Sequence, residues 1–138
     1  MAMDTYDGWP LDGALTDNAE PKAAEAIIAG MMIKKDATSK MIKATGAANE
    51  RAYFALEDQS DFAVVGAKKM AFITKNAVML TDQFDTGGTY TPGTRLMVDS
   101  GNAGKLKVYG GGAEPVIGHA DGLKTRDEIS YLKVVLEI

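Results

Sequence analysis

The sequence of 138 residues contains no cysteine and a single histidine, His119. The absence of cysteine excludes disulfides, thiolate nucleophiles and cysteine-ligated zinc sites. One histidine cannot form a multi-histidine metal centre, and a Ser-His-Asp triad would have to be built around His119 alone. We therefore expect no enzyme, no cofactor and no metal site, and we look for function in the organisation of the chain.

Long apolar runs and an excess of basic residues are also absent. No run approaches the roughly 18 apolar residues of a membrane-spanning helix, and the N-terminus has no basic region followed by an apolar stretch. The net charge of −4 and the pI near 4.9 argue against binding to nucleic acid through phosphate neutralisation. The 46% hydrophobic content and the length indicate one globular domain with one core.

The negative charge is concentrated at the start of the chain. Residues 1–30 hold six acids and one base, whereas the remaining 108 residues hold 13 acids and 14 bases. Residues 1–20 show neither a helical nor a strand period, because Gly8, Pro10 and Gly13 interrupt them. We interpret residues 1–20 as an extended acidic arm.

The arm carries large apolar side chains that a disordered tail normally lacks. Either these residues pack over the protein's own core, or they anchor the arm on a partner, with the single tryptophan as the main anchor. The candidate partner-binding residues, for a capsid or a neighbouring subunit, are Tyr6, Trp9, Leu11 and Leu15.

Residues 21–29 permit two interpretations. Pro21 suits the first position of a helix and Gly30 suits the end of one, which favours a helix of nine residues. A helix that short is marginal without tertiary packing, so a strand over residues 25–29 that turns at Gly30 is the alternative. Both interpretations stay open at this point.

From Met31 onward the chain reads as short strands separated by residues that favour turns. Leu132, Val134, Leu136 and Ile138 alternate with polar or exposed-type residues, which predicts a half-buried strand, and residues 105–109 alternate in the same way. One helical turn is possible at residues 125–130. The expected strands are 31–35, 40–44, 52–56, 70–74, 78–82, 94–98, 105–109, 115–120 and 131–138.

These patterns predict an all-β fold, with a small β-barrel or sandwich of short strands and at most one short helix. Residues 21–138 form the single β-domain, and the arm precedes it. The glycine-rich segments do not change this prediction. Residues 101–105 lack the first glycine and the Ser or Thr of a phosphate-binding loop, and residues 110–112 are followed by Pro115 where a dinucleotide motif needs glycine, so both are turns.

Two acidic clusters, residues 57–61 and 81–85, contain enough carboxylates for a paired-acid glycosidase or a calcium site. Both follow expected strands, where acidic turn residues are common, and we interpret them as solvated turns. His119 could act as a general base with Asp121 two positions on, but no nucleophile can be named beside it, so a structural role is favoured. The methionines on expected strands are interpreted as core residues.

The order of the segments resembles that of the head decoration, or capsid cement, proteins of tailed bacteriophages. The resemblance covers about residues 24–138, and the succession of the segments carries it. The segments are Ala29-Gly30-Met31-Met32-Ile33-Lys34-Lys35-Asp36, residues 40–45 and 52–58, Thr81-Asp82-Gln83-Phe84-Asp85, residues 90–98 and 104–107, Val116-Ile117-Gly118-His119-Ala120 and the closing strand 131–138.

This resemblance implies a β-barrel or β-tulip-like body on the outer face of a capsid, where it binds the major capsid protein and stabilises the expanded head. It also implies self-association, with a trimer favoured, and no active site. The protein would be made in the host cytoplasm and located on the virion surface. The acidic arm lies outside the resemblance, so its role in attachment is inferred from its residues alone.

Two alternatives remain open from the sequence. The first is another virion component, such as a head-fibre base, a tail-tube subunit or a connector. The second is a carbohydrate-binding or hydrolytic β-domain that uses Glu57, Asp58, Asp82 or Asp85, with Tyr53, Tyr90, Tyr109 or Tyr131 as an aromatic platform.

Overall fold

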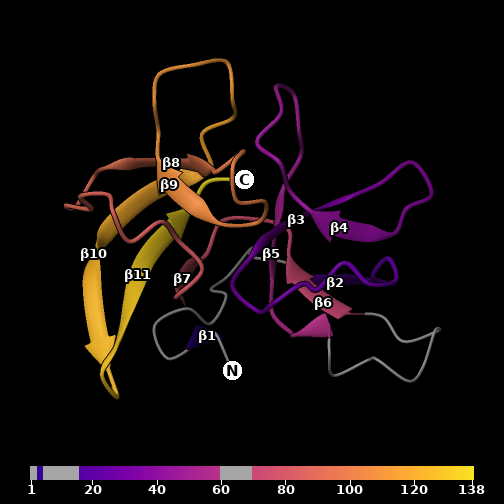
Figure 1. The fold of residues 1–138 in the computed structure, drawn as a ribbon, viewed down its shortest axis with the longest axis horizontal. Helices are drawn as coiled ribbons and strands as arrows, with labels where there is room; N and C mark the ends of the chain where they lie inside the picture. Colours follow the sequence, from indigo (N-terminus) through magenta and orange to yellow (C-terminus); the bar gives the residue numbers. More distant parts are fainter. Residues whose placement is uncertain (1–2, 5–15, 60–69) are drawn as a thin grey trace.

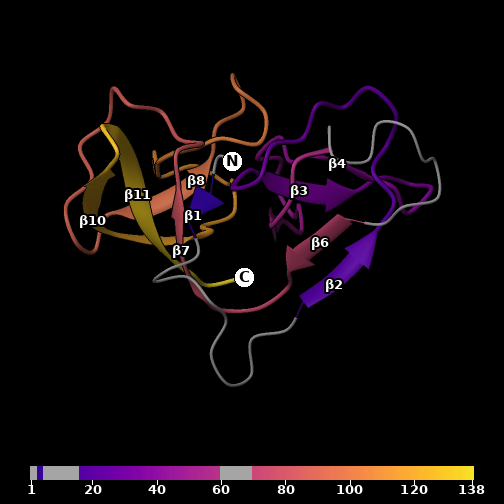
Figure 2. The same ribbon diagram turned by 90° about the horizontal axis from the view of Figure 1, so that it is seen from below.

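The structure is a computed structural model, and it describes residues 3–4, 16–59 and 70–138. These residues form two antiparallel sheets, which lie as two neighbouring lobes in Figure 2. The six-stranded sheet has the order β1 (Met3–Asp4), β7 (Val78–Thr81), β11 (Ile129–Leu136), β10 (Gly118–Arg126), β8 (Arg95–Val98) and β9 (Leu106–Val108). The five-stranded sheet has the order β2 (Thr16–Ala19), β6 (Met70–Ile73), β5 (Tyr53–Ala55), β3 (Met32–Lys35) and β4 (Met41–Lys43) (Figure 1).

The all-β prediction is confirmed. Each of the nine expected strand segments contains strand residues, and the described part of the chain contains no helix, hence none that could span a membrane. The two sheets do not join into one closed barrel. The five-stranded sheet comes near to closing on itself, because residues after β2 bridge β4: the Met41 amide donates to the Glu20 carbonyl, and the Lys22 amide donates to the Met41 carbonyl, both at 2.9 Å.

The main core lies between the two sheets and takes alternate residues from each strand. Met32, Phe54 and Ile73 of the five-stranded sheet point into it, as do Met79, Leu96, Leu132, Val134 and Leu136 of the six-stranded sheet. The neighbouring residues Ile33, Ala55 and Phe72 point the other way and form a second cluster with Ile27. Because side chains alternate between the faces of a strand, both faces of the five-stranded sheet are apolar and covered.

The residues that the alternating pattern predicts to face inward are therefore buried, with one local exception. Leu132, Val134 and Leu136 are fully buried and Ile138 packs against them, as expected. In β9, Leu106 is fully buried, but Val108, the last residue of this edge strand, is 37% exposed. The strand methionines, including Met32, Met41, Met70 and Met79, are buried core residues.

Residues 21–29 are neither the helix nor the strand that the sequence suggests. Ala24 and Ala26 both have a positive φ of 60°, which neither a helix nor a strand accepts. The reason lies elsewhere in the chain: side chains at 58 and 59 bond the backbone of this segment, so its amides do not need regular secondary structure. Ile27 is thereby placed over the outer face of the five-stranded sheet.

The chain reverses tightly between β10 and β11, where a helical turn had been considered possible. Asp127 and Glu128 both have positive φ values, 49° and 65°, as in a type I′ hairpin turn, and the helical turn is wrong. β10 is also longer than the expected strand. A bulge at Gly122, with φ 88°, places one extra residue between Ala120 and Leu123, and pairing then continues to Arg126.

Two short strands fall inside the segment interpreted as the arm. Met3–Asp4 pairs with β7, and Thr16–Ala19 pairs with β6, where Ala19 joins the second apolar cluster. Neither strand has an alternating pattern of its own, because an edge strand can be held by backbone hydrogen bonds to its neighbour.

Candidate functional site

One concave part of the described surface lies where two loops project from the same end of the molecule. These are the β4–β5 loop, residues 44–52, and the β9–β10 loop, residues 109–117, both at the top of Figure 1. Between them is a groove of about 510 Å³, which we call the loop groove. It is lined by Asn49, Glu50, Arg51, Ala52, Ala113, Pro115, Val116, Ile117 and Ile138.

Glu50 holds the β4–β5 loop in shape. Its carboxylate accepts hydrogen bonds from the Thr45 amide at 3.0 Å, the Thr45 hydroxyl at 3.0 Å and the Gly46 amide at 2.8 Å. It also forms an ion pair with Lys34 of β3 at 2.7 Å, although only 3% of the Glu50 side chain is exposed. A buried carboxylate is tolerated only when its oxygens are paired in this way.

The electrostatics of Glu50 follow from these contacts. Burial alone would raise its pKa, but the hydrogen bonds from Lys34, Thr45 and Gly46 outweigh burial and hold the pKa below the usual glutamate range. The charged form is therefore the stable one at neutral pH. Gly46 fixes the loop from the other side, because its φ is 77° and a Cβ there would lie 2.7 Å from the Val98 carbonyl oxygen.

The rim of the loop groove is basic. Arg51 is exposed; its Nε donates to the Tyr53 hydroxyl at 3.2 Å, and its guanidinium lies over the Tyr53 ring. A smaller hollow of about 320 Å³ adjoins the groove and shares Asn49, Glu50 and Arg51 with it, and it adds Lys34 and Lys35. Within the described residues, neither Arg51 nor Lys35 has a carboxylate in ion-pair contact. The result is an apolar groove with positive charge along one side.

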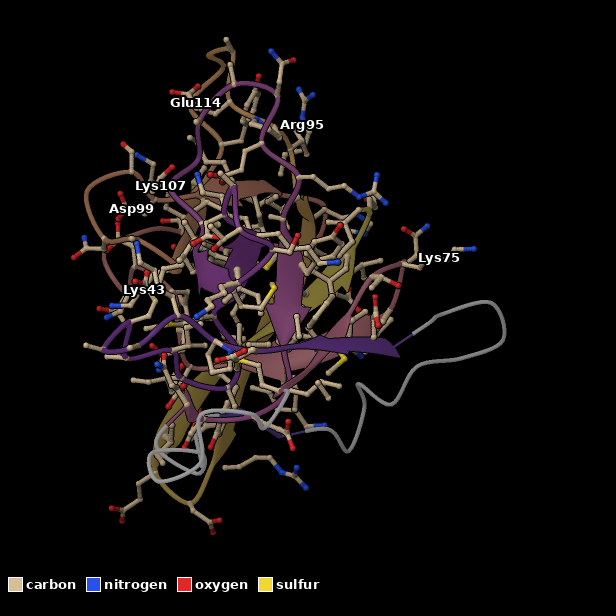
Figure 3. The ribbon with its side chains drawn as sticks, turned by 90° about the vertical axis from the view of Figure 1, so that its right-hand side faces the viewer. Lys43, Lys75, Arg95, Asp99, Lys107 and Glu114 are labelled. Carbon is tan, nitrogen blue, oxygen red and sulfur yellow. The ribbon has the colours of Figure 1, made fainter. Side chains whose placement is uncertain are left out.

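The second wall is the β9–β10 loop, which is anchored at both ends. The Tyr109 amide donates to the Arg95 carbonyl at 2.9 Å, and the Tyr109 hydroxyl donates to the Gly112 carbonyl at 2.6 Å. The Arg95 guanidinium lies over the Tyr109 ring, and in Figure 3 Arg95 and Glu114 are both at the loop end. The Ile117 amide donates to the Leu96 carbonyl at 2.8 Å, so the loop rejoins the sheet there.

The first acidic cluster has a structural use. Glu57 accepts from the Ala71 amide and Asp58 accepts from the Ala29 amide, both at 2.7 Å. Gln59 bonds the backbone at two points in residues 22–27. Residue 61 lies outside the described residues. The carboxylates considered for glycosidase chemistry in this cluster therefore tie Ala29 and β6 to the end of β5.

The second acidic cluster is also part of turns. Asp82 accepts from its neighbour Gln83, and Asp85 accepts from the Gly87 amide at 3.0 Å. The Tyr90 hydroxyl donates to the Asp85 carbonyl, and its ring packs edge-on against Phe84. Burial, and then the nearby charges of Asp85 and Asp99, raise the pKa of Tyr90 to about 12.

His119 lies on the outer face of the six-stranded sheet, and its partner is not the expected one. Its Nδ1 is 2.5 Å from Glu137 Oε1, whereas Asp121 pairs with Lys133 at 3.5 Å. No serine or threonine hydroxyl in the described part of the chain bonds the His119 ring. The general-base arrangement with Asp121 is therefore not formed in this structure.

The glycine motif at 101–105 forms the turn between β8 and β9, as predicted. Asp99 accepts from the Gly101 amide at 2.9 Å and from the Asn102 amide group at 3.1 Å, and Lys107 is 3.7 Å away. The Asn102 hydrogen bond, which is opposed by burial and reinforced by Gly101 and Lys107, lowers the pKa of Asp99. In Figure 3 the labelled Asp99 and Lys107 lie side by side.

The aromatic residues offered as a carbohydrate platform do not gather on one surface. Tyr90 and Tyr131 are buried, at 5% and 7% exposure, and Tyr53 packs on Phe72 in the second apolar cluster. Tyr109 holds the β9–β10 loop. The four arm residues expected to bind a partner, Tyr6, Trp9, Leu11 and Leu15, lie outside the described residues.

In residues 3–4, 16–59 and 70–138, no group of three or more His, Asp or Glu residues is placed to hold a metal ion. No protein family, curated protein or solved structure compared with this chain matches it. The case for a function therefore depends on the geometry of the site and on the sequence.

Sequence reasoning missed the residues that form this site. Glu50 and Arg51, and Lys34 further upstream, belong to no motif that the sequence alone identifies as a site. The available signal was a lone glutamate four residues after a Thr-Gly pair, which matches a carboxylate that caps a turn. That pattern does not indicate that the carboxylate is buried or that its cation comes from β3.

Proposed function

We propose that the protein is a non-enzymatic virion component that binds the outer surface of a phage capsid and stabilises the expanded head. The observation that supports this best is the use of the polar side chains. Glu50, Asp58 and Asp99 serve as internal supports for loops, and the candidate catalytic groups are bonded within the fold. What the described surface offers instead is area for contact: a loop groove and a projecting hairpin.

A capsid-binding role suits a protein of this construction. Many copies on a regular lattice can use modest individual contacts, because multivalency converts weak binding into stable attachment. The order of segments along the sequence, which resembles that of capsid cement proteins, supports the same proposal. The major capsid protein is then the expected partner, and the acidic segment with Trp9 is the expected point of attachment.

The direct test is co-sedimentation of the purified full chain with expanded capsids that lack it. Saturable binding, at a copy number comparable to that of the capsid subunits, is expected. Binding at a few positions only, or no binding, would contradict the proposal and favour a vertex, fibre or tail component.

The role of Trp9 is tested by substitution and not by truncation, because Thr16–Ala19 is part of a sheet. Trp9→Ala is expected to weaken capsid binding and leave the melting temperature nearly unchanged. Ile28→Ala, at an exposed apolar residue of the body, serves as the control. A large fall in melting temperature for Trp9→Ala would place this side chain in the protein's own core.

A further inference from the structure

An edge strand of the five-stranded sheet, β4, is covered by chain without regular structure. β4 lies at one end of the strand order and pairs with β3 on one side. Along its other side runs the segment of residues 20–29, which we call the strap (Figure 1). The Met41 amide donates to the Glu20 carbonyl at 2.9 Å, and the Lys43 amide donates to the Glu25 carboxylate at 2.8 Å. The Glu25 side chain thus takes the place that a carbonyl of a neighbouring strand would have.

Two side chains from the end of β5 hold the strap in place. The Gln59 Oε1 accepts from the Ile27 amide at 3.1 Å, and its Nε2 donates to the Lys22 carbonyl at 2.7 Å. The Gln59 amide also donates to the Ile27 carbonyl at 2.8 Å. Asp58 accepts from the Ala29 amide at 2.7 Å. One glutamine therefore joins both halves of the strap to the body of the protein.

The backbone of the strap is strained at two positions. Ala24 and Ala26 both have a φ of 60°, which is unfavourable for any residue with a Cβ. Ala24 is the third residue of a turn in which the Glu25 amide lies 3.4 Å from the Lys22 carbonyl, and glycine is favoured at that position when φ is positive. The contacts of the strap with the body must compensate for this strain.

The ends of the strap are fixed, whereas its middle contributes little to the core. β2 ends at Ala19, and beyond the strap the Gly30 amide donates to the Ala55 carbonyl at 2.8 Å. Between these points, Ile27 is the one strap residue in the second apolar cluster. Segments with few buried apolar contacts open at a lower free energy than the sheets they cover. The geometry therefore defines a short unit that can open by itself.

We propose that the strap opens as one unit while both sheets stay folded, and that the closed strap blocks the free edge of β4. Opening breaks the bonds to Asp58 and Gln59 and leaves the Met41 and Lys43 amides without their acceptors. Unpaired amides along an edge strand are the groups to which an extended segment of another chain adds as a strand. The strap is then an autoinhibitory cover. Its opening needs no capsid, so this proposal goes beyond the proposed function.

Hydrogen exchange of the backbone amides, measured by NMR on the full chain, tests the opening. Lys43 and Ala44 form a matched pair, because the Lys43 amide bonds the strap while the Ala44 amide donates to the Met32 carbonyl inside the sheet at 3.0 Å. After correction for intrinsic rates, Lys43 should exchange at least about tenfold faster than Ala44. Its protection should match that of Ile27 and Ala29 within about threefold, as expected for one opening unit.

A variant away from β4 tests whether the strap opens as a unit. Gln59→Ala should speed exchange at Met41 and Lys43 by about tenfold relative to Ala44, although the Gln59 side chain bonds neither amide. The control is Gln83→Ala, at the other glutamine of the sequence, whose side chain bonds the neighbouring Asp82. This control should leave the ratio of the Lys43 and Ala44 rates unchanged.

A second variant should have the opposite effect. Ala24→Gly with Ala26→Gly relieves the strain of the closed strap, so exchange at Lys43 should slow by about threefold or more. Ala23→Gly is the matched control, because Ala23 lies in the same turn without a positive φ and a glycine there only adds freedom to the open strap. Exchange at Lys43 should become faster or stay the same in this control.

Three results would overturn the proposal. The first is equal protection of Lys43 and Ala44 in the wild-type chain. The second is a Gln59→Ala variant in which this ratio does not change, and the third is a double glycine variant that exchanges faster at Lys43 than Ala23→Gly does. If Gln59→Ala does not fold, as judged by circular dichroism, the wild-type ratio and the glycine variants decide. These measurements use purified protein alone, so they are independent of capsid co-sedimentation.

Discussion

Removing the Glu50 carboxylate tests whether the loop groove is held by a buried ion pair. Loss of one partner of a buried pair typically costs about 3–5 kcal/mol, because the remaining charge is left without compensation. Lys34 retains 24% side-chain exposure and can be rehydrated, which places Glu50→Ala at the lower end, about 3 kcal/mol. For a chain of this length that corresponds to a fall of about 10 °C in melting temperature.

Two further variants separate the charge from the hydrogen bonds. Glu50→Gln keeps the shape, but it removes the charge that pairs with Lys34 and replaces one acceptor oxygen with an amide nitrogen that cannot accept, so we expect a loss of about 2–3 kcal/mol. Lys34→Met removes the cation and leaves those bonds in place. A double-mutant cycle between these two changes measures the ion pair itself, and the coupling should be clearly above the error of about 0.3–0.5 kcal/mol.

The contribution of Glu50 to stability should decrease as the pH is lowered. The pKa of Glu50 is lowered in the folded state, so its contribution is complete above the unfolded value, about 4.3, and is lost as the pH falls below it. The stability difference between wild type and Glu50→Gln should therefore be constant near neutral pH and shrink below about pH 4.

Urea titrations followed by circular dichroism give the free energies, with the slope of each curve as a check that the folded and unfolded states are unchanged. A loss of less than about 1 kcal/mol for Glu50→Ala would refute the reasoning, since it lies below the cost of any uncompensated buried charge. The rim of the groove would then not be preorganised by Glu50.

Three other predictions concern the body of the fold. Gly118→Ala should destabilise the protein by about 3 kcal/mol or prevent folding, because a Cβ there would lie 2.1 Å from the Val135 carbonyl oxygen and neither backbone can move cheaply. Thermal unfolding measures this loss of stability, and a loss under about 1 kcal/mol contradicts the prediction. An ultraviolet titration should show Tyr90 ionising with a pKa of about 12, and since this value is raised, stability should fall as the pH rises from about 10 to 12. Asp58→Ala should lower the free energy of unfolding by about 1–3 kcal/mol, because the buried Ala29 amide loses its hydrogen-bond acceptor. Denaturant unfolding measures this loss, and no loss would mean that Asp58 is only a solvated turn residue.

The strands could be predicted from the sequence, because the alternation of apolar and polar residues that defines each strand lies within a few neighbouring positions. Leu132, Val134 and Leu136 alternate within a few residues, and burial of one face is enough to fix their register. Residues 21–29 show the opposite case. Their conformation depends on hydrogen bonds to Asp58 and Gln59, about 30 positions away. The local sequence of residues 21–29 gives no indication of these distant partners.

The candidate site was not predictable for a related reason. Glu50 becomes a buried partner of Lys34 only once β3 and the β4–β5 loop are assembled, so both residues look like ordinary surface charges in the sequence. The hairpin turn was missed because Asp127-Glu128 lacks the glycine that usually marks a type I′ turn, and the long β10–β11 pairing supplies the register instead. The role proposed for Trp9 and its neighbours concerns residues outside the described ones and remains a prediction.

The order of strands in the six-stranded sheet constrains how the chain folds during synthesis. β7 lies between β1 and β11, the first and the last strands in chain order, so this sheet cannot be completed until β11 has left the ribosome. The five-stranded sheet uses only β2 to β6 and can pair its strands much earlier. Pairing between such distant segments is slow compared with local folding, so we expect an intermediate in which the β7 edge is exposed for some time. In that interval the half-built sheet is the part of the molecule most open to aggregation.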